Sequence, residues 1–481
     1  MLSLMMISGR VTGFMRELML ARTFGASIEA DLAIVLLTLP DIFTGLLLAG
    51  GLNAALVPAF KQLEPKVGAK LFVQIVIGII FIFSAFAFVI FLWPAIIVNL
   101  VAPGLAPLYA HGRTAVWLCV GLAIVATAAT GVTSAMLNSQ NRFGVAGAGT
   151  LIFNTTMMIG LIFCTPNVVK VDVFALFVLI ACLIRLVSQL VSLRTIPVSN
   201  AFSKNLISKN LIFAFFGAFS ATSLIVLVPA VVRSVGSLMG PGSLATINYA
   251  TKLVELPLGI VITTISIVAL PALADYYSGN NSAAMGRAFR TGLRRGVIFA
   301  VAIGLPMAAF SVEIVTGIFS LSGLSADVVG QIARIFQVLT LTLPLIAISS
   351  MQGVLLNASA RTRRFFVAIA AAFACFILFL MAAYAAQSFF MVVFSMVVFH
   401  LSACVFLRVA SGEPMFTLSQ TNAVLLVQGV AVSLTTIAIA KFALQFMEDD
   451  AFVKSAVIAG FSVLISFFFS LWALNRVKEN I

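Results

Sequence analysis

The segment ISGRVTGFMRELMLARTFGASIEAD, residues 7–31, combines the apolar composition of a membrane helix with four charged side chains of interest: Arg10, Arg16, Glu17 and Asp31. Each charge costs roughly 2.5–3.5 kcal/mol at the centre of a helix that faces lipid. A hydrated cavity removes this cost, and arginine suits diphosphate there because its planar fork offers paired donors to phosphate oxygens. We predict that Arg10 and Arg16 bind a diphosphate-bearing anion. Glu17 and Asp31 would keep them oriented when the site is empty.

Helical geometry limits how these charges can act together. At about 100° per residue, Arg10 and Glu17 share one face of a helix, whereas Arg10 and Arg16 lie about 120° apart. Both arginines can face one cavity only if the helix bends, and Gly9 and Gly13 offer places for a bend. A structural network of ion pairs therefore stays open as the alternative to substrate binding.

A second group of charges lies in the apolar stretch near residues 230–256. Lys252 and Glu255 are three residues apart, so they can pair across one turn of a helix. Arg233 adds a further positive charge. We predict Lys252 as a third substrate-binding residue, with Glu255 and Arg233 as supporting charge. The alternative is that these side chains snorkel or pair structurally near helix ends.

Composition and motifs exclude most other chemistry. The 481 residues are 62% hydrophobic and 9% charged, whereas soluble domains carry about 25% charged residues. The sequence contains no P-loop, GxGxxG or GxSxG motif, so we expect no ATP hydrolysis and no enzyme activity. The five cysteines and two histidines have no metal-type spacing, so we expect no metal and no cofactor. The net charge of +13 is expected to orient the chain in a membrane rather than to bind nucleic acid.

The hydrophobic segments predict an all-α polytopic membrane protein with about fourteen transmembrane helices, at about 20 residues for each crossing. The expected spans are 3–24, 30–60, 69–102, 114–138, 144–165, 172–193, 207–238, 243–274, 289–319, 325–356, 365–386, 388–409, 419–446 and 451–475. With a cytoplasmic N-terminus, the loop Lys and Arg residues fall mostly on the cytoplasmic side. Both termini are therefore expected to be cytoplasmic.

Short motifs recur in the same order in the two halves of the chain. LTLPDIF (37–43) resembles VELPLGI (254–260), and ALVPAF (55–60) resembles VALPAL (268–273). The repeat predicts two pseudo-symmetric six-helix lobes around a central cavity, residues 1–204 and 205–410, followed by two further helices in 411–481. Pro40 and Pro257 are expected to break equivalent helices of the two lobes.

The stretch SGRVTGFMRELMLARTFGASIEADLAIVLLTLPDIF, followed by GGLNAALVPAF, resembles the N-terminal signature of the MurJ/MviN lipid II flippases. These belong to the multidrug/oligosaccharidyl-lipid/polysaccharide exporter superfamily. The resemblance recurs in INYATKLVELPLGIVITTISIVALPALADYY (247–277) and LNSQNRF. It implies transport of undecaprenyl-diphosphate-linked peptidoglycan precursor (lipid II) from the inner to the outer leaflet, by alternating access and without ATP. It further implies an electropositive central cavity and a lipid-tail groove formed by the last two helices. We expect a monomer of the inner membrane, whose partners are membrane lipids and the lipid-linked glycan.

Carried over by position, Arg10, Arg16 and Asp31 match charged positions on which the family relies, and Glu17 stands where the family usually has Asp. The chain also departs from the family pattern. After Leu-Pro in the second helix the family has two arginines and a glutamate, where this chain has Thr44, Gly45 and Ala49. The family's Asp-Arg pair in the eighth helix is replaced by Thr251 and Lys252.

These departures leave the substrate open. A flippase for another polyprenyl-diphosphate-linked glycan, such as an exopolysaccharide or O-antigen unit, is the main alternative. A drug/cation antiporter of the same fold is less favoured because it would need an acidic cavity. A non-transporting membrane scaffold is disfavoured by the charges retained in the first helix.

Overall fold

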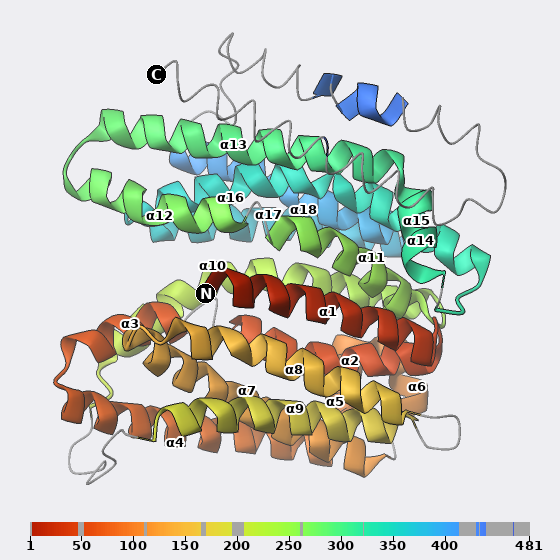
Figure 1. Ribbon diagram of the computed structural model, residues 1–481, viewed down its shortest axis with the longest axis horizontal. Helices are drawn as coiled ribbons and strands as arrows, with labels where there is room; N and C mark the ends of the chain where they lie inside the picture. Colours follow the sequence, from red (N-terminus) through yellow and green to blue (C-terminus); the bar gives the residue numbers. More distant parts are fainter. Residues whose placement is uncertain are drawn as a thin grey trace. The chain divides into compact units, whose positions relative to one another are not determined.

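The computed structural model describes residues 2–46, 52–109, 113–164, 170–194, 206–259, 263–320 and 322–412, together with 430–431, 433–438 and 465. Throughout these ranges the regular structure is helical, without a strand (Figure 1). Within the described part of the chain, nine helices are long and apolar enough to cross a bilayer. The prediction of an all-α polytopic membrane protein is confirmed.

The first twelve predicted spans each coincide with one helix or with two consecutive helices. The last two, 419–446 and 451–475, lie almost entirely outside the described residues. The count of fourteen transmembrane helices therefore stays a prediction. Helices are the expected solution here, because lipid offers no partners for backbone N–H and C=O groups.

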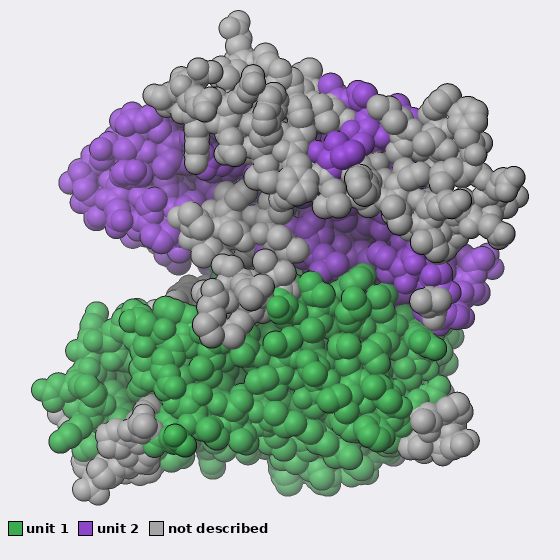
Figure 2. Space-filling model, viewed as in Figure 1, with its two compact units in different colours: residues 1–245 green, residues 246–481 purple. Residues whose placement is uncertain are grey.

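The chain forms two compact units, which Figure 2 colours separately. The first unit is Met1–Ala245. Its helices are α1 (Leu2–Phe24), α2 (Ile28–Thr44), α3 (Asn53–Gln62), α4 (Pro65–Leu92), α5 (Pro94–Val101), η2 (Pro103–Leu105), α6 (Ala106–Tyr109), α7 (Thr114–Ser139), α8 (Phe143–Phe163), α9 (Lys170–Ser192), α10 (Lys209–Gly236) and η3 (Ser237–Met239). Helix α11 (Ser243–Pro257) begins in this unit and continues into the second.

Helix α7 forms the centre of the first unit, where it packs against α2, α3, α4, α8 and α9. Of its most apolar 18-residue window, 72% is buried, compared with 17% in α4. The α7 sequence is rich in Ala, Gly and Thr, which lets neighbouring helices approach closely. Helix α4 instead exposes Phe81 and Ile82, as expected of a helix that faces lipid.

The second unit is Thr246–Ile481. Its helices after α11 are α12 (Thr263–Ser278), α13 (Ser282–Ala309), α14 (Ser311–Phe319), α15 (Ala326–Thr340), α16 (Thr342–Ala358), α17 (Thr362–Ala385) and α18 (Phe389–Ser411). Helix α16 packs against α12, α13, α17 and α18, and α17 packs along α18.

The helix order of the first unit recurs in the second. A 28-residue helix followed by a short helix occurs in both, with α4 and α5 separated at Trp93 and α13 and α14 separated at Phe310. Pro40 lies inside α2 and Pro257 ends α11, and each of these helices is followed by a π-helical turn. This order parallels the predicted sequence repeat. Equivalence of the two prolines by superposition stays a prediction.

Helix α10 packs against α2, α3 and α5 and belongs to the first compact unit. The sequence repeat places the same helix at the start of the second lobe, residues 205–410. The packing of α10 against the first unit does not test where the sequence repeat begins or ends. The lobe boundaries at 204 and 410 therefore stay predictions.

Candidate functional site

Helix α1 lies against α8 at a close approach made by two glycines. A Cβ atom at Gly9 would come within 3.3 Å of Thr150, and one at Gly13 within 3.0 Å of Asn154 Nδ2. The spacing is that of the GxxxG pattern, in which small residues bring membrane helices into contact. The helix continues unbroken from Leu2 to Phe24. The two glycines thus act as packing positions, and α1 places its charges against α8.

The charged side chains of α1 form a buried network with α8. Arg16 Nη2 donates to Glu17 Oε1 at 2.6 Å, and Arg16 Nη1 donates to Asn154 Oδ1 at 3.0 Å. Asn154 Nδ2 donates in turn to the carbonyl oxygen of Gly9 at 2.9 Å. The guanidinium carbon lies 5.8 Å from the centre of the Phe153 ring. One asparagine therefore joins the α1 backbone to the buried arginine.

Because the Arg16–Glu17 pair is buried, its hydrogen bonds constrain the position of α1 on α8. The side chains of Arg16 and Glu17 are only 6% and 3% exposed. A buried ion pair tolerates desolvation only when further hydrogen bonds satisfy its remaining polar atoms, and loss of one partner is strongly destabilising. Asn154 supplies such a bond. These contacts match the structural ion-pair network that the sequence left open for Arg16, whereas Arg10 is half-buried on another face of α1.

Asp31 occupies a different position from the one expected of an arginine partner. Its side chain is buried, and its two oxygens accept hydrogen bonds from the backbone N–H groups of Gly242 (2.8 Å) and Ala245 (2.7 Å). Gly242 directly precedes α11 and Ala245 lies in its first turn, where a helix has unsatisfied donors and a partial positive charge. Asp31 therefore caps α11 from α2.

Gly242 is required for this contact on two grounds. Its φ is +77°, a conformation that favours glycine. A Cβ atom there would collide with the carbonyl group of Ala26, in the turn between α1 and α2. Sequence reasoning identified neither Gly242 nor Asn154. The available signals were the Gly-Pro-Gly turn at 240–242 and a lone amide in the apolar run GTLIFNTTMM.

The second group of predicted residues lies on α10 and α11. Lys252 Nζ and Glu255 Oε2 are 2.7 Å apart, so the pairing predicted from their spacing is confirmed. Their side chains are 25% and 42% exposed, so the pair is only partly buried. Thr251 is buried and donates to the carbonyl oxygen of Ile247 at 2.7 Å. Arg233 is half-buried near the end of α10.

The structure gives a packing reason for one departure from the family pattern. Gly45 follows α2, and a Cβ atom there would come within 3.0 Å of Val226 on α10. A larger side chain at this position would need the Val226 side chain to shift. The side chain of Thr44 and the whole of Ala49 lie outside the described residues. No group of three or more His, Cys, Asp or Glu residues in the described part of the chain is placed to hold a metal ion.

The fold of the chain resembles that of solved membrane transporters. A multidrug resistance MATE family transporter of the MOP superfamily, in an inward-facing conformation, aligns with a TM-score of 0.66 at 14% identity, covering 85% of this chain and 98% of that one. The lipid II flippase MurJ in an inward closed conformation aligns with a TM-score of 0.81 at 18% identity, covering 99% of both chains. The chain is thus a multi-pass membrane protein with the all-α fold of these two structures.

The family model of the lipid II flippase MurJ matches residues 20–468, and the chain belongs to this family. It is 24% identical to the lipid II flippase MurJ of Burkholderia cenocepacia over 344 residues, or 68% of this chain and 66% of that one. It is 27% identical to the probable lipid II flippase MurJ of Rhizobium tropici over 286 residues, or 56% and 53%. These alignments span less than two thirds of each relative. The resemblance inferred from the N-terminal signature is confirmed.

The cap on α11 predicts a stability difference between two acidic residues of the same helix turn. Asp31→Ala removes the acceptor of two buried N–H groups and should cost about 1–2 kcal/mol. Glu29→Ala is the control, because Glu29 is exposed in the first turn of α2. Thermal unfolding of the purified chain in detergent measures both, with Asp31→Asn expected between them. Equal melting temperatures for the two alanine variants would show that the cap is energetically unimportant.

The network on α8 predicts a similar contrast between adjacent residues. Asn154→Ala removes an acceptor for Arg16 and a donor to Gly9, and should destabilise the chain by about 1–3 kcal/mol. Thr155→Ala is the control, because Thr155 is exposed on the same helix. Unfolding midpoints and the amount of protein in the membrane are the readouts. If Asn154→Ala unfolds like Thr155→Ala, the buried network does not hold α1 on α8.

Proposed function

We propose that this chain moves lipid II, the polyprenyl-diphosphate-linked peptidoglycan precursor, from the inner to the outer leaflet for cell-wall synthesis. The family match over residues 20–468 carries this proposal. The charges retained on α1 support it, because a protein that handles a diphosphate inside a membrane needs cations there. Transport would use alternating access without ATP, in line with the transporter fold.

In this mechanism the cations have different tasks. Arg10 and Lys252 are the cations proposed to bind substrate, since Arg10 is half-buried and the Lys252 side chain is 25% exposed. Arg16 contributes positive charge nearby and positions α1 through Glu17 and Asn154. Lysine's ammonium has three donors, so Lys252 can bind phosphate while its pairing with Glu255 is retained. Arg233 adds positive potential from α10.

A second candidate is transport of another polyprenyl-diphosphate-linked glycan. The observation that favours it is the packing of Gly45 against Val226, at a position where the family resemblance leads us to expect an arginine. Such a chain keeps diphosphate recognition through α1 but has lost cationic contacts from its second helix. The two candidates differ in the glycan and share the lipid diphosphate.

We further propose that the protein is a monomer of the inner membrane with both termini cytoplasmic. The excess of Lys and Arg in alternate loops supports this orientation. In a cysteine-free background, a cysteine at Ser282 should then react only with reagent that reaches the cytoplasm. A cysteine at Thr114 should react from outside intact cells, and the reverse pattern would reject the orientation.

The sharpest test of substrate binding falls on Arg10. Lysine at Arg16 would not separate recognition from structure, because the forked contacts with Glu17 and Asn154 need a guanidinium even without substrate. At Arg10, lysine keeps the charge and loses the paired donors. Arg10→Lys should therefore lower transport of labelled lipid II in proteoliposomes about tenfold, and Arg10→Ala should lower it further.

The control for Arg10 is Arg22→Lys, because Arg22 is exposed in the last turn of the same helix. It should transport like the unmodified chain. Full transport by Arg10→Lys would reject forked recognition at this residue. Full transport by Arg10→Ala at normal abundance would reject any substrate contact there.

A further inference from the structure

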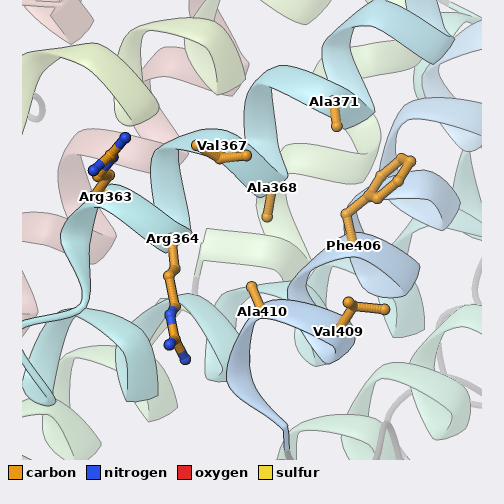
Figure 3. Close-up of a pocket in the computed structure, with 8 residues that line it drawn as sticks. All are labelled: Arg363, Arg364, Val367, Ala368, Ala371, Phe406, Val409 and Ala410. Carbon is orange, nitrogen blue, oxygen red and sulfur yellow. The ribbon is translucent and has the colours of Figure 1, made fainter.

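A pocket of about 460 Å³ opens between the start of α17 and the end of α18 (Figure 3). The two helices form an antiparallel hairpin, joined at residues 386–388 and packed along their length. Val367 and Ala371 line the pocket on α17, and Phe406 and Val409 line it on α18. Its volume lies within the roughly 300–1,000 Å³ range of small-molecule sites.

Small residues create the hollow between these two helices. Arg364, Val367, Ala368 and Ala371 follow the i, i+3, i+4, i+7 spacing of one helix face, and Ala410 completes the opposite wall. Alanines at three of the lining positions leave space that larger side chains would fill. The hollow therefore depends on the small residues of both helices.

Positive charge is concentrated at one end of the pocket. Arg363 and Arg364 lie at that end and Ala371 and Phe406 at the other, as Figure 3 shows. Arg361 and Arg408 add two cations at the same end of the hairpin. The sequence from 361 to 412 contains no Asp or Glu, and the next acidic residue, Glu413, lies outside the described residues. Among described residues, none of these four arginines forms an ion pair.

The backbone adds to this positive potential. Helix α17 begins at Thr362, with no acidic residue in its first turn and no side-chain hydrogen bond from Arg361 at its N-cap. The N-terminus of a helix carries free N–H donors and a partial positive charge that favours anions. The first turn of α17 thus presents donors at the same end as Arg363 and Arg364.

The remaining walls face the surroundings of the helix pair. Val367 is 57% and Val409 76% exposed. Both helices are long and apolar enough to cross a bilayer, and in such a helix pair these exposed side chains would contact lipid. The arginines lie at the helix ends, which in a pair of helices that crosses the bilayer corresponds to headgroup depth. From Arg364 to Ala371 the helix rises about 10 Å, which carries the apolar part of the pocket into the hydrocarbon region.

We propose that this pocket binds an anionic glycerophospholipid, with its phosphate on Arg363 and Arg364 and an acyl chain along Val367, Ala371 and Phe406. Charge complementarity selects the headgroup, since basic pockets between transmembrane helices bind phospholipid headgroups. The site uses none of the residues proposed for the transported substrate. Specific binding in this pocket should depend on the shape of the hollow. A general attraction of arginines to lipid headgroups should not.

Native mass spectrometry of the full chain in mild detergent tests the proposal, with phosphatidylglycerol and phosphatidylcholine of identical acyl chains as probes. Arg363→Gln with Arg364→Gln should weaken phosphatidylglycerol binding about tenfold or more, from the loss of two phosphate contacts. Arg361→Gln with Arg408→Gln is the matched control, because it removes the same charge at the same end outside the pocket lining. Ala371→Phe fills the hollow with all charges kept, and Ala382→Phe is its control at an exposed position of α17.

The proposal expects loss of phosphatidylglycerol in both pocket variants, retention in both controls, and little phosphatidylcholine throughout. Thermal unfolding in lipid-free detergent verifies that each variant is folded. Equal loss in the two arginine pairs, or full binding by Ala371→Phe, would overturn the proposal in favour of general electrostatic attraction. Equal binding of phosphatidylcholine would overturn headgroup selection. Full competition by soluble glycerol 3-phosphate would overturn recognition of a lipid.

Discussion

The buried ion pair between Arg16 and Glu17 is the constraint on which the N-terminal half of the molecule depends. Two charges that are almost fully desolvated persist only when their other polar atoms are also satisfied. Asn154 on α8 meets this need, and it reaches Arg16 because Gly9 and Gly13 let α1 approach α8 closely. The position of α1, and with it the position of Arg10, follows from one hydrogen-bonded network. The residue proposed to bind substrate and the residues that pack α1 against α8 therefore lie on the same helix.

A second buried carboxylate extends this organisation to α11. Asp31 holds the first turn of α11, which begins in the first compact unit and carries Lys252 and Glu255 in the second. The contact is possible because Gly242 adopts a positive φ next to Ala26. Two acidic residues predicted to orient arginines thus have distinct surroundings, since Glu17 contacts an arginine and Asp31 contacts backbone donors. Both arrangements neutralise a charge that lipid would not tolerate.

The helical spans, the Lys252–Glu255 pair and the family could be predicted from sequence because they depend on local composition, spacing or signature residues. The hydrogen bond between Arg16 and Asn154 could not be predicted from sequence, because the two residues are 138 positions apart and meet only through helix packing. Asp31 was assigned to arginines for the same reason, as its donors lie 211 and 214 residues along the chain. Glycine spacing alone likewise could not distinguish a bend from a packing position at Gly13.

The central claim is that this chain carries lipid II across the membrane by means of the cations on α1. Replacement of the essential lipid II flippase in a bacterium from which that protein is depleted tests it most directly. The account predicts that the unmodified chain restores growth and lipid II translocation, that Arg10→Ala does not, and that Arg22→Ala does. Failure of the unmodified chain at normal membrane abundance, together with translocation of a different polyprenyl-diphosphate-linked glycan, would contradict the lipid II assignment. Rescue by Arg10→Ala would contradict the role given to α1.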